Sequence, residues 1–295
     1  MNEKIIDLYL NLAFERHSMW YKRTILKEPK PWTNNKILRD FHFTNVFRDL
    51  DKTSQYIINK VIKPLSDDFE NLWRHLIVYR YISKLEIFEE IEPYIIPGDF
   101  RSLEKHLKYR ELEGKSCVTG AYFIRHTEGM RLMEYVFNLV EQIDKSDFRS
   151  VLKENSLQKM TKFYTQFECV GGFMAYEYTT DLTYTSALSR AEDLYTWANL
   201  GPGCNTGINL LKKRYPLNKK NQDYLEDMEI IKQRWEEKFR SHSYSKLPKE
   251  LMKRLIAPQM RDIEHWLCEF GKYAKYHTLV SKNIAFKHRK YQGRC

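Results

Sequence analysis

The segment from residue 167 to residue 210 constrains the fold of this chain more than any other part. The 295-residue sequence has only 11 glycines, and five of them fall between Gly171 and Gly207. Glycine is favoured where the backbone must turn tightly, so this segment should contain sharp turns. Apolar residues elsewhere recur at helical spacing, which predicts that these turns join helices. The sequence therefore predicts an all-α fold.

Helices are predicted almost throughout the chain. In the first of them, Arg16 and Arg23 share one helical face. Two prolines follow this helix, and Thr33 or Asn34 can cap the next one. The helices are predicted at residues 2–26, 44–63, 66–84, 129–144, 148–154, 155–165, 219–240, 248–256 and 258–276, with a shorter one within 86–100 that ends at Pro97-Gly98.

Three segments are predicted to be less regular than the rest. Residues 100–127 lack a clear helical pattern, and a short strand or an extended turn is expected within 114–125. The loop 241–248 and the tail 282–295 are expected to be non-helical. With neither an internal repeat nor a low-complexity linker, residues 1–295 are predicted to form one continuous domain. Any division would give two intimately packed helical lobes, with a helix-hairpin-helix core at about 129–214 and the N- and C-terminal helices in the second lobe.

Charge is distributed unevenly along the chain. Residues 1–200 have 28 Lys and Arg against 29 Asp and Glu, whereas residues 201–295 have 21 against 10. This concentrates the formal net charge of +10 in the last third. A one-sided basic surplus suits a polyanion such as DNA, because neutralised phosphates release their counterions. A merely soluble basic face is the alternative.

Cysteine and apolar content place the chain in a broad class. Five scattered cysteines with no CxxC pair indicate reduced thiols, and they predict neither an iron–sulfur loop nor a zinc site. No run of about 18 apolar residues occurs, so no membrane partner is expected. We expect a cytoplasmic protein without a bound metal or cofactor.

Residues 167–175, Phe-Glu-Cys-Val-Gly-Gly-Phe-Met-Ala, resemble the hairpin of the DNA glycosylase superfamily. In such a motif the backbone N–H groups of the turn bind a nucleic-acid phosphate. Cys169 stands where the superfamily has its first glycine, so Gly171 and Gly172 are the residues expected to supply the turn. An ordinary helical hairpin also uses glycines in this way, and that alternative stays open.

Two aspartates near this hairpin are candidate catalytic groups. The glycosylase fold places an aspartate at the mouth of its base pocket, and Asp193 has about the corresponding spacing, while Asp181 lies earlier. A carboxylate there can act as a base or stabilise a cationic transition state. The alternatives are that Asp193 pairs with Arg190 and that Asp181 is a polar helix end. Phe173 occupies the position of the lysine of bifunctional glycosylases, so lyase chemistry is not expected.

The turn Gly201-Pro202-Gly203 is the clearer signal for an anion site. It opens a predicted helix in which Asn205 and Thr206 follow as capping residues. The N–H groups at such a helix start attract anions, and Lys212, Lys213 and Arg214 are expected nearby. The chain contains no GxxxxGK[ST] motif, so the usual P-loop for a nucleoside triphosphate is absent.

Three segments together resemble one known family. They are PWTNNKILRDFHFTNVFRDLDKTSQYI at 31–57, the segment 171–211, and MRDIEHWLCEFGKYAKY at 260–276. Together they resemble the DNA-glycosylase-like alpha-glutamyl/putrescinyl thymine pyrophosphorylases. That family includes the helical domain of 5-hydroxymethyluracil DNA kinases, and its members serve thymidine hypermodification in bacteriophage DNA.

The resemblance implies an activity on modified DNA. A partner kinase would pyrophosphorylate the 5-hydroxymethyl group of uracil, and an amino acid or polyamine would then displace pyrophosphate to form a C–N bond. The base must be flipped out of the duplex for this reaction. The site residues that the resemblance implies are Arg48, Asp51, Asp181, Gly201, Pro202, Gly203, Glu264, Glu269 and Lys272.

Other interpretations remain open at this stage. Arg48 with Asp51, three apart on one helical face, and Glu264 with Glu269 and Lys272 can instead form salt bridges that lock the lobes together. A monofunctional glycosylase for a modified base is a second function. A non-catalytic reader of modified DNA that assists a 5-hydroxymethyluracil DNA kinase is a third. If the chain is phage-encoded, we expect it in the host cytoplasm.

Overall fold

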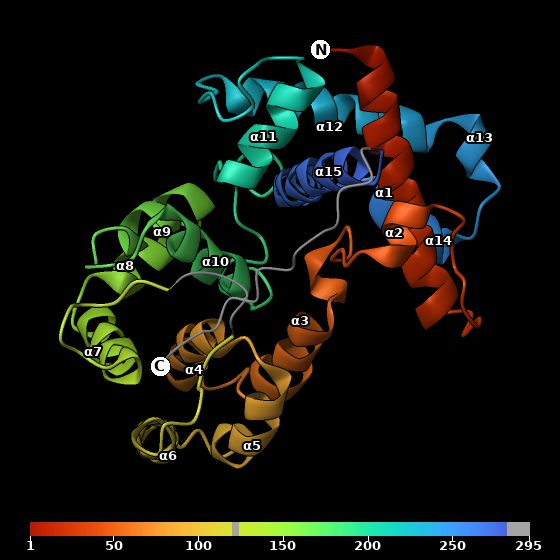
Figure 1. Ribbon diagram of the computed structural model, residues 1–295. Helices are drawn as coiled ribbons and strands as arrows, with labels where there is room; N and C mark the ends of the chain where they lie inside the picture. The colour runs from red at the N-terminus through yellow and green to blue at the C-terminus, as the bar shows by residue number, and fades with distance from the viewer. Residues whose placement is uncertain (120–123, 282–295) are drawn as a thin grey trace. The chain divides into compact units, whose positions relative to one another are not determined.

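A computed structural model describes residues 1–119 and 124–281 of the chain (Figure 1). Within these ranges the chain forms fifteen α-helices, one 3-10 turn (η1), one π-helical turn (η2) and no strand. The predicted all-α fold is confirmed for this part of the chain. None of these helices is both long and apolar enough to cross a membrane. The predicted tail 282–295 and part of the irregular segment 114–125 lie outside the described residues.

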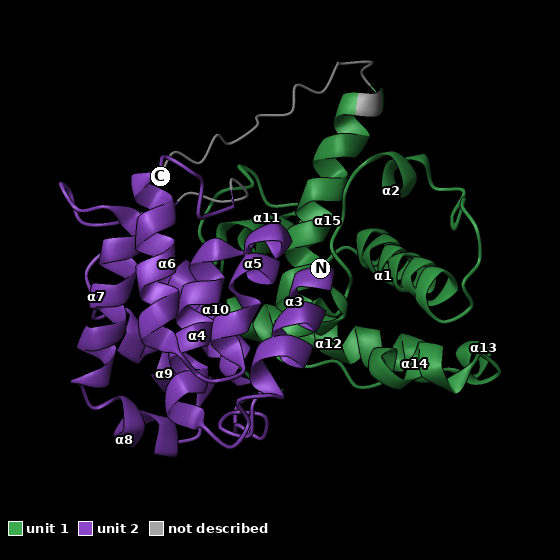
Figure 2. Cartoon of the chain, turned by 90° about the horizontal axis from the view of Figure 1, so that it is seen from below, with its two compact units in different colours: residues 1–51, 194–287 green, residues 52–193, 288–295 purple. Residues whose placement is uncertain are grey.

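The helices form two compact units (Figure 2). Among the described residues, unit 1 consists of 1–51 and 194–281, and unit 2 consists of 52–119 and 124–193. Residues 1–51 and 194–281 thus belong to the same unit although they are distant in sequence. The range 129–214, expected as the hairpin core, is divided between the units after residue 193.

Unit 1 is organised around its last helix, α15. The indole nitrogen of Trp266 on this helix donates to the backbone oxygen of Tyr9 at 3.1 Å. The ring of Tyr9 meets that of Phe270 edge-on, with 5.5 Å between the ring centres. These buried aromatic contacts anchor the first helix of the chain on the last. The helices of unit 1 are α1 (Glu3–Thr24), α2 (Lys36–Asp40), η1 (Arg48–Leu50), α11 (Pro202–Leu211), α12 (Tyr224–Arg240), α13 (His242–Ser245), α14 (Lys249–Leu255) and α15 (Met260–Ser281).

Glycines allow α11 and α15 to pack closely together. A Cβ atom added at Gly207 would fall on the backbone carbonyl group of Leu267, with its carbon 2.9 Å away. One added at Gly203 would overlap the side chain of Cys268. Gly203 and Gly207 are four residues apart and so lie on one face of α11. These two glycines therefore serve the close approach of two helices rather than a turn.

Unit 2 surrounds α4, which is buried on almost all sides from Leu72 to Ile82. A helix buried all round must be covered by others, and α4 packs against α5, α6, α7, α10 and η2. The helix predicted over 66–84 extends from Phe69 to Ile82, and Asp68 caps it by accepting from the N–H of Asn71 at 3.1 Å. The helices of unit 2 are α3 (Lys52–Ile57), η2 (Ile58–Ile62), α4 (Phe69–Ile82), α5 (Leu85–Ile95), α6 (Phe100–Leu112), α7 (Leu132–Asp144), α8 (Phe148–Lys153), α9 (Leu157–Tyr164) and α10 (Gly172–Leu182).

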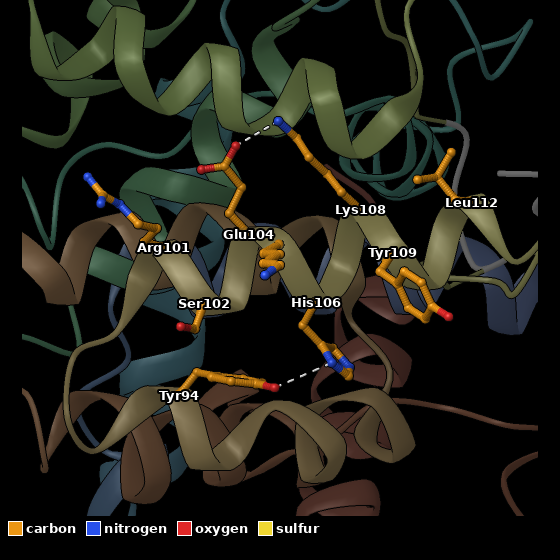
Figure 3. A pocket seen from close by; sticks show the side chains of 9 residues that line it. Tyr94, Arg101, Ser102, Glu104, His106, Lys108, Tyr109 and Leu112 are labelled. Carbon is orange, nitrogen blue, oxygen red and sulfur yellow. Dashed lines mark hydrogen bonds and ion pairs between the residues drawn. The ribbon is translucent and has the colours of Figure 1, made fainter.

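Helix α6 was not expected from the sequence. Asp99 caps it by accepting from the N–H of Ser102 at 3.0 Å, and Leu103 and Leu107 bury one narrow face. Most other positions of this helix are polar, and Tyr109 and Leu112 are exposed, which obscured its helical period in the sequence. Figure 3 shows polar side chains of this helix, among them Lys108, which pairs with Glu104 at 2.7 Å. The prediction of an irregular segment was wrong for 100–112.

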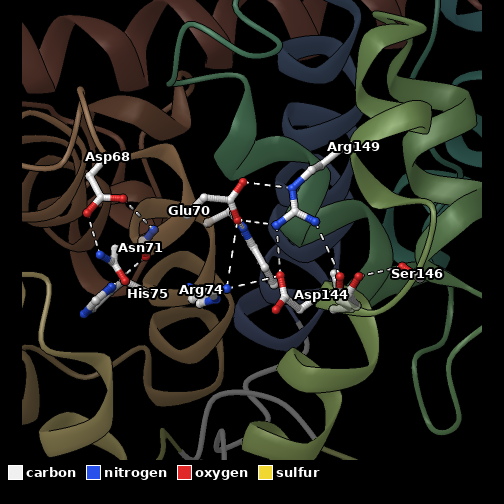
Figure 4. Close-up of polar contacts among 10 residues, drawn as sticks. Asp68, Glu70, Asn71, Arg74, His75, Asp144, Ser146 and Arg149 are labelled. Atoms are coloured by element: carbon white, nitrogen blue, oxygen red, sulfur yellow. Dashed lines mark hydrogen bonds and ion pairs between the residues drawn. The ribbon is translucent and has the colours of Figure 1, made fainter.

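A polar network on the surface of unit 2 links α4, α7 and α8 (Figure 4). Arg149 donates to both carboxylate oxygens of Glu70, at 2.9 and 2.5 Å, and to Asp144 at 3.0 Å. Arg74 pairs with the same Asp144 at 3.1 Å. These side chains are substantially exposed, so the network positions the helices more than it stabilises them.

The segment 44–51 forms a tight loop instead of the beginning of a helix. The backbone N–H of Asn45 donates to Asp51 Oδ1 at 2.8 Å, and its side-chain amide donates to the carbonyl of Leu50 at 2.8 Å. The helix predicted over 44–63 therefore begins only at Lys52. Asp51 is extended (φ −73°, ψ 149°), so the prediction that it shares a helical face with Arg48 was wrong.

Candidate active site

In unit 1 the loop 44–51 lies against α15. The N–H of Thr44 donates to Glu269 Oε2 at 3.1 Å, and its hydroxyl lies 2.8 Å from Nε2 of His265. Lys272 is within 2.8 Å of both carboxylate oxygens of Glu269. Asp51 accepts from the N–H of the next loop residue, Asn45, at 2.8 Å and lies within the electrostatic influence of Glu269. The structure thus brings together Asp51, Glu269 and Lys272, three of the residues implied by the family resemblance.

The charges in this cluster perturb one another. Burial raises the pKa of Asp51, against the lowering effects of the Asn45 N–H and of the charges on Arg48 and Arg16. Burial also lowers the pKa of His265 well below its usual value, and the cationic Arg48 adds to this effect. His265 is therefore neutral at physiological pH. Asp51 is a carboxyl group that holds its proton more readily than an ordinary aspartate.

Helix α11 begins within the Gly-Pro-Gly segment as predicted, with Pro202 as its first residue and Gly203 already inside the helix. A Cβ atom added at Gly201 would lie 3.4 Å from Oε1 of Glu264. A carboxylate of the protein thus already stands close to this helix start, where the N–H groups favour negative charge. Lys212 is at the other end of α11 and pairs with Asp227 at 2.8 Å. The expectation that it lies near the helix start was therefore wrong.

Asn205 and Thr206 on α11 make contacts within unit 1. The buried side chain of Asn205 donates to the carbonyl of Lys219 at 3.1 Å and accepts from the N–H of Asn221 at 2.9 Å. The hydroxyl of Thr206 donates to the carbonyl of Pro202 at 3.0 Å. Asn205 therefore fixes the loop that follows α11.

In unit 2, α9 and α10 are joined by a short turn that contains Cys169. Cys169 adopts φ +61°, a left-handed conformation that favours glycine. Gly171 has φ −80° and Gly172 is the first residue of α10. The turn therefore depends on Cys169, and the expectation that the two glycines supply it was wrong. A cavity of about 450 Å³ adjoins the turn and is lined by Phe173 among others.

Asp181 is buried in an ion-pair group of unit 2. Arg80 donates through Nε to Asp181 Oδ2 at 2.9 Å and through Nη2 to Asp181 Oδ1, and its Nη1 lies 2.5 Å from Glu177 Oε2. Asp181 is 1% exposed and Glu177 is 6% exposed. The forked geometry of arginine suits two carboxylates, and this contact fastens α10 to α4. Asp181 is thus held by an arginine rather than directed at an open pocket.

Asp193 caps α9. Its Oδ1 accepts from the N–H of Leu157 at 2.8 Å, and its Oδ2 accepts from the N–H of Gln158 at 2.9 Å and from the hydroxyl of Ser156 at 2.8 Å. These N–H groups belong to the first turn of α9, which has no partners for them within the helix. The contacts give Asp193 a structural role.

We predict that Asp193→Ala lowers the free energy of unfolding by about 1–2 kcal/mol, because it removes this cap. Urea denaturation followed by circular dichroism measures the effect. The neighbouring exposed Glu192→Ala is the matched control and should leave the midpoint unchanged. An unchanged midpoint in Asp193→Ala would show that the cap contributes nothing to stability.

Comparison with known proteins identifies the family. The family model for the helical domain of 5-hmdU DNA kinase matches residues 3–282. The chain belongs to this family. A curated relative, the 5-hmdU DNA kinase of Bacillus phage SP10, is 26% identical in an alignment of 303 positions that includes 92% of this chain. The chain spans 45% of the length of that relative. No solved structure matches this chain significantly.

As a member of the 5-hmdU DNA kinase helical-domain family, the chain is related to a phage enzyme that acts on modified DNA. The sequence-predicted residues fall into two groups. Arg48, Asp51 and the residues of α11 and α15 belong to unit 1, whereas Asp181, Asp193 and the hairpin belong to unit 2. Within 1–119 and 124–281, no three His, Cys, Asp or Glu side chains converge as a metal site would require.

The sequence-based interpretation of this family member missed a basic cavity of about 230 Å³ in unit 1. Arg16 and Arg23 of α1 line it together with Lys30, Trp32 and Arg39. The signal was available, since Arg16 and Arg23 stand seven residues apart on one face of α1. Only the fold brings the loop that contains Lys30 and Trp32 to that face.

Proposed function

We propose that the chain is a DNA base hypermodification transferase. In this reaction an amino acid or polyamine displaces pyrophosphate from pyrophosphorylated 5-hydroxymethyluracil in DNA. The observation that carries the proposal is the cluster of Asp51, Arg48, His265, Glu269 and Lys272, which coincides with segments that resemble the thymine pyrophosphorylases. Membership of the 5-hmdU DNA kinase helical-domain family supports a substrate with this modified base.

The reaction requires one nucleophile, one leaving group and one proton acceptor. The nitrogen of the amine attacks the methylene carbon on C5 of the base, and a C–N bond forms. The C–O bond to the diphosphate breaks, and the diphosphate departs with that electron pair. The attacking nitrogen must lose a proton, so a general base is needed. DNA would bind through the basic last third of the chain, and a 5-hydroxymethyluracil DNA kinase would supply the substrate.

We assign the general base to Asp51. Burial raises its pKa, and a base with a raised pKa accepts a proton from an ammonium group more readily. The side chain is partly exposed, so a substrate can reach it. Asp181 is almost fully buried against Arg80, and the oxygens of Asp193 are engaged at the start of α9. Both are therefore less suited to proton transfer.

The direct test uses DNA that contains pyrophosphorylated 5-hydroxymethyluracil. The chain is incubated with this DNA and with common amino acids or putrescine, and the digested nucleosides are analysed by mass spectrometry. A new C–N adduct together with released pyrophosphate is the expected result. Free base with abasic sites would instead indicate a glycosylase. Binding without any covalent change would indicate a non-catalytic reader.

We predict that Asp51→Asn lowers kcat for adduct formation by about 10²–10⁴-fold. The asparagine still accepts the N–H of Asn45, so the loop should keep its shape. The wild-type rate should rise with pH, because only the deprotonated form of Asp51 accepts a proton. This rise should occur at a higher pH than the ionisation of an ordinary aspartate, because burial raises the pKa of Asp51. Asp193→Asn is the matched control and should keep the activity. A fully active Asp51→Asn variant would exclude this base.

A further inference from the structure

The basic cavity of unit 1 has the size and walls of a small anion site. It is formed by α1, the connection to α2, α2 itself and residues 41–43. Its volume of about 230 Å³ is below the ~300–1,000 Å³ typical of pockets for drug-sized ligands. The cationic residues in its wall are Arg16, Arg23, Lys30 and Arg39, and no carboxylate lines it.

Three of these cations lack a carboxylate partner. In the part of the chain that the structure describes, Arg16, Arg23 and Lys30 form no ion pair, while Arg39 pairs with Asp40 at 3.2 Å. Like charges gathered around one cavity repel each other, so such an arrangement favours a bound anion. The nearby carboxylate of Glu15 accepts from the hydroxyl of Thr33.

Arg16 is the most buried of these cations, at 7% exposed. One of its nitrogens, Nη2, donates to the carbonyl of Phe43 at 3.1 Å, which fixes the guanidinium in the cavity wall. Burial lowers the pKa of Arg16 to about 10, so it stays charged at neutral pH. The residue after Phe43 is Thr44, whose N–H donates to Glu269, so this wall of the cavity adjoins the candidate active site.

Trp32 organises the other two cations. Its indole N–H donates to the carbonyl of Glu28 at 2.8 Å, which fixes the ring. Arg23 and Lys30 lie over this ring, at 5.8 and 5.3 Å from its centre. Cation–π contacts of this kind hold two positive groups near each other without neutralising them. The cavity is therefore pre-arranged for an anion with several charges.

Other places in the two units are less suited to such an anion. The start of α11 already has the carboxylate of Glu264 beside it. The cavity on α6, shown in Figure 3, contains Lys108 paired with Glu104 and His106 3.0 Å from Glu90. Its wall thus includes the carboxylate of Glu104, which would repel an anion, and Lys108 already has this carboxylate as its partner.

We propose that the cavity bounded by Arg16, Arg23, Lys30 and Trp32 binds the diphosphate group. This inference rests on the proposed function for the identity of the anion, and it assigns the leaving group a place. A diphosphate carries several negative charges near neutral pH, which suits three cations without a carboxylate partner together with Arg39. A single DNA backbone phosphate carries only one. Arginine forks also suit phosphate oxygens.

Titration calorimetry with inorganic pyrophosphate, in the absence of DNA, tests the site directly. The wild-type chain should bind pyrophosphate more tightly than orthophosphate. Arg23→Ala and Lys30→Ala should each raise the Kd for pyrophosphate by about tenfold, since each removes one charged contact. Lys36→Ala removes an equal charge from the exposed start of α2, outside the cavity, and should leave the Kd unchanged.

Tryptophan fluorescence gives a second measurement that locates the ligand. Pyrophosphate should draw Arg23 and Lys30 from the ring of Trp32 and change its emission. In Trp32→Phe this response should be lost while the chain remains folded. Binding that neither Arg23→Ala nor Lys30→Ala weakens, or an emission change that survives in Trp32→Phe, would overturn the assignment.

A duplex without modified bases separates the two sources of phosphate. If Arg23→Ala weakens binding of this duplex but not of pyrophosphate, the cavity holds a backbone phosphate and the diphosphate assignment fails. The transferase assay is independent of this result. If Arg23→Ala forms the adduct and binds pyrophosphate with the wild-type Kd, the assignment of the cavity fails and the proposed function stands. Tight pyrophosphate binding without any adduct would refute the proposed function while the site stands.

Discussion

Replacing Arg80 with methionine should destabilise unit 2 by about 3–5 kcal/mol. The substitution leaves the carboxylates of Glu177 and Asp181 buried at 6% and 1% exposure without the guanidinium that both of them contact. An uncompensated buried charge costs far more than the net stabilisation that the ion pair provided. Urea denaturation followed by circular dichroism measures the loss.

Two controls separate this effect from a general loss of packing. Lys159→Met breaks an exposed pair with Glu154 and should not change the unfolding midpoint measurably. Adding Glu177→Gln and Asp181→Asn to Arg80→Met should restore part of the stability, because the stranded groups are then neutral.

Lowering the pH should also restore part of the stability of Arg80→Met. In Arg80→Met the folded state raises the pKa of both carboxyl groups, so the folded protein binds more protons than the unfolded one and regains stability as the pH falls from 7 towards 5. A variant as stable as the wild type at pH 7 would contradict the prediction.

Gly207→Ala should lower the free energy of unfolding by about 2–3 kcal/mol. The new Cβ atom would fall on the carbonyl group of Leu267, which is backbone and cannot rotate away, so α11 and α15 must separate. The better helix propensity of alanine, about 0.5–1 kcal/mol, offsets only part of this strain. Thermal and urea unfolding of the purified variant measure the difference.

Gly271→Ala is the matched control at the same pair of helices. Its added Cβ atom would lie 3.4 Å from the methyl group of Thr206 and 3.5 Å from the carbonyl oxygen of Gly203, which are ordinary contacts. This variant should be as stable as the wild type or up to about 1 kcal/mol more stable. Equal effects of the two substitutions would show that close packing at Gly207 is not the cause.

Local periodicity was enough to predict most helices of this chain. Residues 2–26 were expected to be helical and α1 extends from Glu3 to Thr24, because Ile6, Leu10 and Ala13 form a buried stripe. The same reasoning failed where polar groups decide the backbone. At 44–51, hydrogen bonds from Asn45 to Asp51 and to Leu50 replace the predicted helical turns.

The candidate site was harder to predict because its contacts are distant in sequence. Asp193 was placed at a pocket by its spacing from the hairpin, yet its hydrogen bonds go to residues 156–158. Gly203 and Gly207 suggested a turn, but the segment that requires them lies on α15. Arg48, Asp51 and Glu269 were selected through the family resemblance. Periodicity alone would not have selected them.

The order of elements along the chain has a consequence for synthesis. Residues 52–193, which provide unit 2, form one uninterrupted segment, whereas unit 1 needs both the first 51 residues and a helix that ends at Ser281. During translation, α1 therefore leaves the ribosome long before its partner α15 exists. Its apolar face, which includes Tyr9 and Leu10, therefore lacks its packing partner until α15 has been synthesised. Unit 2 can fold while the chain is still growing, and unit 1 forms last.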